Sequence, residues 1–157
     1  MSSDGREIEP PRGSWHDDSI YGLRVVVGDH ERGDWRSELV LDIDHIVEWV
    51  CGLDRRPRFR VAPASLIFHD VTDLQVAVDC GDTGGRVALH ALSIDRVARE
   101  RIEDQKVCFD RPYFRWRIEL NWPAGGSIVF AASGFTQTLR AEPVLQDEQW
   151  LPAATRV

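Results

Sequence analysis

Two short stretches of the sequence combine residue types that could bind a metal ion. Residues 14–18 read SWHDD, and residues 68–70 read FHD, so an aromatic side chain precedes a His-Asp pair in both. Imidazole and carboxylate groups together suit zinc, iron or manganese, and such an ion can activate water for hydrolysis. If the fold brings the stretches together, the sequence predicts a metal site. The candidate ligands are His16, Asp17, His69 and Asp70.

The same stretches also fit a purely structural role. Aligned without gaps, residues 15–27 and 68–80 match Trp15 with Phe68, and both continue into alternating, strand-like segments. Asp and Ser/Thr side chains can cap a turn while the aromatic residue anchors it to the core. We favour two similarly built chain corners over a metal site, because short motifs often arise by chance. We find no complete catalytic constellation, and we expect neither catalytic residues nor a cofactor.

Alternating apolar residues predict an all-β fold. The clearest case is residues 113–122, where five apolar side chains alternate with polar ones. Other strand-like segments and the turn signals between them give an antiparallel β-sandwich or strongly curved sheet of seven to eight strands, with at most one short helix. The alternative is an α+β fold with a helix near residues 94–105. These other segments are residues 21–27, 38–50, 65–71, 73–80, 87–94 and 127–140.

The length and composition predict one domain. Residues 1–14 are polar and non-periodic, so we expect a disordered tail followed by a single β-rich domain over residues 15–157. No apolar run approaches the roughly 20 residues that cross a bilayer, and the N-terminus does not resemble a signal peptide. We therefore expect a cytoplasmic protein that has no membrane partner.

The charge distribution makes nucleic acid an improbable partner. The formal net charge is −7, and residues 15–54 contain ten acidic residues but three arginines. Such a surface repels phosphate backbones. Alternation along residues 38–50 predicts that Asp42, Asp44 and Glu48 share the outer face of a strand. We expect these three acids to contact a basic protein partner, with plain solubility as the alternative explanation.

The order of these features resembles a known group of proteins. Residues 15–25 (WHDDSIYGLRV) and 61–79 (VAPASLIFHDVTDLQVAVD) are followed by residues 113–122 (YFRWRIELNW) and 134–140 (GFTQTLR). This pattern resembles small uncharacterised bacterial proteins, among them immunity proteins of polymorphic toxin systems. The resemblance implies an all-β domain that acts by binding. The arginine cluster in residues 55–60 and the N-terminal tail depart from the pattern.

Three functions therefore remain open. The favoured one is a non-catalytic binding module, similar to an immunity or inhibitor protein, that uses its acidic surface to engage a basic partner. The second is a metal-dependent hydrolase built on the two His-Asp stretches. The third is a subunit of a homo-oligomer, such as a homodimer, in which another copy covers an apolar sheet face.

Overall fold

The protein is all-β, as the sequence predicts. A computed structural model describes residues 15–81, 88–103 and 111–156. Within these ranges nine strands form one antiparallel sheet, and the helices are two 3-10 helices of three residues each. The expected N-terminal tail, residues 1–14, lies outside the described residues and stays a prediction. No helix in this part of the chain is long and apolar enough to cross a membrane.

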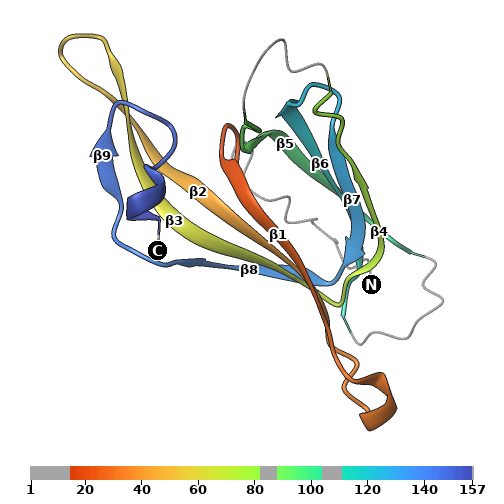
Figure 1. The fold of residues 1–157 in the computed structure, drawn as a ribbon. Coiled ribbons are helices and arrows are strands. Elements are labelled where there is room, and N and C mark those ends of the chain that lie inside the picture. Colours follow the sequence, from red (N-terminus) through yellow and green to blue (C-terminus); the bar gives the residue numbers. More distant parts are fainter. Residues whose placement is uncertain (1–14, 82–87, 104–110, 157) are drawn as a thin grey trace, which may run out of the picture.

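The strands follow one another in the sequence with few long connections (Figure 1). Their bounds are β1 (Ser19–Val27), β2 (Ser37–Cys51), β3 (Pro57–His69), β4 (Thr72–Ala77), β5 (Leu92–Arg101), β6 (Phe114–Trp122), β7 (Ser127–Ala132), β8 (Gly134–Leu139) and β9 (Val144–Gln146). The two 3-10 helices are η1 (His30–Arg32) and η2 (Ala153–Thr155).

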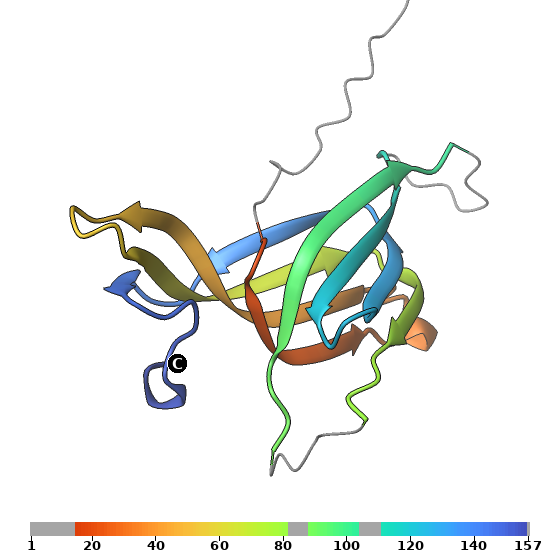
Figure 2. The ribbon, with the colours of Figure 1, turned by 90° about the horizontal axis from the view of Figure 1, so that it is seen from above.

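The sheet is strongly curved, and its two halves face each other across the core (Figures 1 and 2). One half contains β1, β2, β3 and β8, with β9 paired to β3; the other contains β5, β6, β7 and β4. Two chain segments bend from one half into the other. His69 on β3 pairs with Gly134 on β8, and Thr72 on β4 pairs with Ala131 on β7. The halves also meet where β1 and β5 pair at two residues each.

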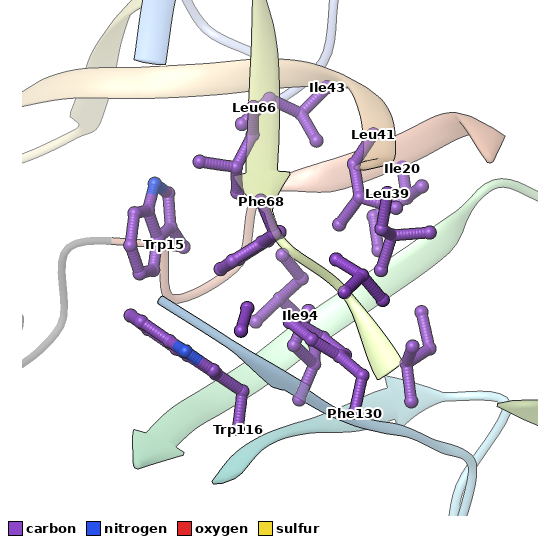
Figure 3. Close-up of a cluster of buried hydrophobic side chains, with 14 of the residues drawn as sticks. Trp15, Ile20, Leu39, Leu41, Ile43, Leu66, Phe68, Ile94, Trp116 and Phe130 are labelled. Carbon is purple, nitrogen blue, oxygen red and sulfur yellow. The ribbon is translucent and has the colours of Figure 1, made fainter. Parts of the chain in front are cut away.

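Aromatic and branched side chains from both halves fill the core between them (Figure 3). Phe68 on β3 is fully buried, and its ring centroid lies 5.0 Å from that of Trp116 on β6 and 4.6 Å from that of Phe130 on β7. The alternation predicted for residues 113–122 is confirmed, because Trp116, Ile118 and Leu120 point into this core. Burial of such large apolar groups is the main force that holds the halves together.

The helical alternative for residues 94–105 is wrong over the part that the structure describes. Residues 92–101 form β5, which pairs with β6 along its length. Register shifts between Ser93 and Ile94 and between Ile94 and Arg96 interrupt the regular alternation of side chains. These bulges place Ile94 in the core and leave its neighbours partly exposed. The spacing of the apolar residues in this segment therefore resembles that of a helix.

A bulge also changes the face assignment that we expected for residues 38–50. The register of β2 against β3 shifts between Ile46 and Glu48. Ile46, before the shift, is buried, whereas Trp49, after it, is 52% exposed. The alternation that we expected along residues 38–50 therefore does not continue past the shift. Ile46 belongs to a second, smaller core on the outer side of the sheet, together with Phe59, Val61 and Leu151.

Candidate binding pocket

The two His-Asp stretches form corners of the same kind. Asp17 and Asp70, which the alignment matches, have positive φ angles of 65° and 56°. Asp adopts this left-handed conformation more easily than most residues other than glycine. The preceding aromatic residues, Trp15 and Phe68, are 3% and 0% exposed. The first corner lies where β1 meets β5, and the second lies where β3 bends into β4, which agrees with the structural interpretation.

The second corner uses its polar groups to hold the fold. The Ser133 hydroxyl donates to Asp70 Oδ2 at 2.5 Å, and Arg111 Nη2 lies 3.1 Å from the same oxygen. His69 Nε2 hydrogen-bonds the Thr136 hydroxyl at 2.8 Å. These contacts tie the bend between β3 and β4 to the bend between β7 and β8, so the corner has a sufficient structural explanation.

The structure does not bring the four proposed metal ligands together. Ser19, which follows the first corner, pairs with Asp44 on β2, whereas His69 of the second corner pairs with Glu38. Asp44 and Glu38 are six residues apart on β2. This separation corresponds to roughly 20 Å along the strand. Among the described residues, no group of three or more His, Cys, Asp or Glu side chains could hold a metal ion.

The first corner differs from the second because its carboxylate faces a pocket. Asp17 Oδ1 accepts a hydrogen bond from Asn121 Nδ2 at 3.0 Å, and Asp17 Oδ2 accepts one from Gln149 Nε2 at 3.2 Å. His16 Nε2 lies 3.5 Å from Asp17 Oδ2. Asp17 is thus held in place by side chains from the end of β6 and from the C-terminal segment, residues 147–156.

The pocket has a volume of about 570 Å³ and lies on the outer side of the sheet. Four separate parts of the chain form it: the first corner with the start of β1, the residues before and at the start of β5, the end of β6, and the C-terminal segment. Its walls combine aromatic rings with polar groups and one carboxylate. The lining residues are Asp17, Ser19, Tyr21, Leu89, His90, Ala91, Ser93, Asn121, Trp122, Gln149 and Trp150.

The sequence motifs indicated Asp17 but none of the other residues that line this pocket. His90 was expected on a strand, but it precedes β5, and its ring centroid lies 6.2 Å from that of Trp122. Asn121 and Gln149 carry no motif. Trp150, at 49% exposed, offers the one usable signal: a large aromatic residue in a polar segment between prolines.

A buried carboxylate lies directly beside the pocket. Asp18 is fully buried; its Oδ1 accepts the Ile46 N–H at 2.9 Å, and its Oδ2 lies 2.6 Å from His45 Nδ1. Burial raises the pKa of Asp18 above its usual value, although the hydrogen bond to His45 opposes this shift. His45 is therefore a partner of a buried acid and fixes the first corner against β2.

Asp44 is also buried, so the expectation that it lies on an exposed acidic face is wrong. It is 0% exposed and accepts hydrogen bonds from Leu151 N at 2.8 Å and from Arg156 Nε at 3.0 Å. The C-terminal segment covers this part of the outer face. The Arg156 guanidinium also stacks on Tyr21, with its central carbon 3.2 Å from the ring centroid. Tyr21 in turn lines the pocket.

The other two acids of the expected stripe lie at the surface, where arginines pair with them. Arg140 donates to Asp42 Oδ1, and Arg60 Nε donates to Glu48 Oε2 at 3.0 Å. The three acids therefore do not form a continuous negative stripe. Arg60 belongs to the basic cluster that follows β2 in the sequence, and it compensates the charge of Glu48.

Comparisons with known proteins find no relative. No protein-family model matches the chain, and searches of curated proteins and of solved structures return no match.

Proposed function

We propose that the protein is a non-catalytic binding module that engages a basic protein partner through the face around the pocket. The observation that carries this proposal is the Asp17 carboxylate, placed in a pocket with aromatic walls. Among the described residues that line the pocket there is no Lys or Arg. Negative charge beside aromatic rings favours a cationic group, since the faces of such rings attract cations.

The charge of the whole chain supports the same type of partner. At a formal net charge of −7, the protein attracts basic proteins over distances comparable to the Debye length and so increases their association rate. Around the pocket, Leu89 and Trp150 are 76% and 49% exposed, so the carboxylate has an apolar rim. Aromatic side chains are enriched at protein-binding surfaces. The resemblance to immunity proteins, which act by binding, points in the same direction.

The test compares two exposed tryptophans. Trp150 lines the pocket, whereas Trp49 lies on β2 and is exposed to nearly the same extent, 52% against 49%. The wild type, Trp150→Ala and Trp49→Ala are used as baits in extracts of the cells that encode the protein. A protein retained by the wild type is identified by mass spectrometry and purified. Its association rate is then measured from about 0.05 to 0.5 M salt.

We expect a basic partner that is lost with Trp150→Ala and kept with Trp49→Ala. Its association rate falls as salt rises, because screening weakens the attraction between opposite charges. Retention of no protein, an acidic partner, or a rate independent of salt would each contradict the proposal.

A homo-oligomer is the second candidate, and one observation favours it. Leu23, Val25 and Val27 alternate along β1 and are 39%, 46% and 61% exposed. This part of β1 pairs with β2, whereas the pairing of β1 with β5 involves Ser19 and Ile20. A second copy could cover these side chains. Light scattering at increasing concentration would reveal a dimer that Val25→Glu dissociates, and a wild-type monomer at every concentration would exclude this candidate.

A further inference from the structure

We infer that the pocket accepts an arginine side chain of the partner, with its guanidinium group against Asp17. This inference rests on the proposed function and adds the residue type that the pocket recognises. Three features carry it: the hydrogen-bonding groups that remain unused in the pocket, an arginine site that the protein already contains beside it, and the size of the pocket.

Around Asp17 the hydrogen-bonding groups that remain unused are mainly acceptors. Asn121 Nδ2 donates to Asp17 Oδ1 and, at 3.4 Å, to Ile94 O, so both of its hydrogens are engaged. Gln149 uses one hydrogen on Asp17 Oδ2. Within the described chain the side-chain carbonyl oxygens of Asn121 and Gln149 accept no hydrogen bond. Asp17 Oδ1 keeps a further lone pair, whereas His16 Nε2 lies 3.5 Å from Oδ2. A guanidinium group has five N–H donors and no acceptor, so it complements this set.

A sugar fits the same set less well. Each hydroxyl group of a sugar is both a donor and an acceptor, and it carries no charge to balance Asp17. Lysine has the charge, but its compact and strongly hydrated ammonium group stacks on aromatic rings less well than a planar guanidinium. Among cationic side chains the pocket therefore favours arginine.

The protein binds one of its own arginines with the same chemistry next to the pocket. The Arg156 guanidinium donates to both oxygens of Asp44, at 3.0 and 3.2 Å, and to Leu151 O at 2.7 Å. The same group stacks on the Tyr21 ring. The pocket offers the equivalent parts in Asp17, the two amide oxygens and the rings of Trp122 and Trp150.

The volume of the pocket agrees with this ligand. At about 570 Å³ it lies within the usual range for small-molecule sites, roughly 300–1,000 Å³. It can hold an extended arginine side chain together with adjoining atoms of the partner. The alkyl part of the arginine would pack against the apolar rim, as long cationic side chains commonly do.

The experiment measures binding of small probes to the full chain. The probes are the methylamides of Nα-acetyl-arginine, Nα-acetyl-lysine and Nα-acetyl-citrulline, together with methyl glucoside. Citrulline has the shape of arginine but a neutral urea group, so it isolates the effect of charge. Dissociation constants come from NMR titration, in which the side-chain amides of Asn121 and Gln149 and the indole N–H groups of Trp122 and Trp150 report the site.

We expect the arginine probe to bind at least about tenfold more tightly than citrulline, the effect of one charge-assisted hydrogen bond. Asp17→Asn should remove most of this preference, and Asn tolerates the positive φ of that position. The control is Asp95→Asn, because Asp95 is half exposed and lies near His16 but does not line the pocket. We expect it to change the constants by less than about twofold. If Asp17→Asn does not fold, Trp150→Ala replaces it, and we expect this variant to bind the arginine probe more weakly.

Three results would overturn the inference: equal binding of arginine and citrulline, tighter binding of the glucoside, or shifts that leave the four reporter side chains unmoved. These results are distinguishable from a failure of the proposed function. A captured basic partner that depends on Trp150, combined with no preference for arginine, overturns the inference alone. Specific binding of the arginine probe without any basic partner overturns the proposed function alone.

Discussion

The ion pair between Asp44 and Arg156 should be the most sensitive polar contact in the protein. Asp44 is 0% exposed and receives three hydrogen bonds, one from Leu151 N and two from Arg156. Arg156→Met keeps an apolar side chain that can cover Tyr21 but removes the charge and both arginine donors. The carboxylate then stays buried without a counter-charge from Arg156 and keeps the Leu151 N–H as a donor. Removal of one partner of a buried ion pair costs about 3–5 kcal/mol.

We expect the lower end of that range, about 3 kcal/mol, because the Arg156 side chain is 13% exposed and water can approach it. In a protein of this size the loss corresponds to a fall in Tm of about 6–12 °C. The assay is urea denaturation followed by tryptophan fluorescence. Asp44→Asn and the double variant complete a cycle, and we expect a coupling energy of at least about 1 kcal/mol between the two sites.

Arg60→Met provides the control for this experiment. It removes an exposed partner of Glu48, and such pairs contribute only about 0–1 kcal/mol. The reasoning is refuted if Arg156→Met costs no more than Arg60→Met, or if the coupling energy is zero. Either result would mean that solvent, rather than Arg156, compensates the charge of Asp44.

Three further predictions concern the core and the titrating groups. Phe68→Ala should lower the free energy of unfolding by about 3–5 kcal/mol, measured by urea denaturation, because it leaves a cavity between the two halves of the sheet. The raised pKa of Asp18 means that its contribution to stability is complete below its unfolded pKa, about 3.9, and is lost as pH rises through the higher folded pKa. The stability of the wild type relative to Asp18→Asn should therefore fall with rising pH across that window, and unfolding curves that keep a constant difference would contradict this. Burial raises the pKa of Tyr21 and of Tyr113, and the negative charge of Asp44 raises the pKa of Tyr21 further. Phenolate absorbance should therefore appear at higher pH in the folded protein than in urea. Titration curves that coincide in the two states would contradict this prediction.

The sequence alone determined the fold class and the nature of the two corners. Alternation in residues 113–122 is a local property, and it predicted β6 because one face of that strand meets the core from Phe114 to Leu120. The matched Asp17 and Asp70 adopt the same left-handed conformation, since short polar side chains favour it without help from distant residues. These features can therefore be recognised from residues that are close together in the sequence.

Only the tertiary structure decided what covers the outer face and where the pocket lies. Asp44 looked exposed because alternation cannot reveal that Leu151 and Arg156, 107 and 112 residues away, return to cover it. The pocket depends in the same way on Asn121 and Gln149, which bond Asp17 across 104 and 132 residues. The alternation of apolar and polar residues predicts which face of a strand is buried. The environment of each side chain, however, also depends on distant segments that pack against the strand. The sequence therefore indicated the acids of β2, but only the fold shows that Asp44 is buried and that the Asp17 carboxylate lines a pocket.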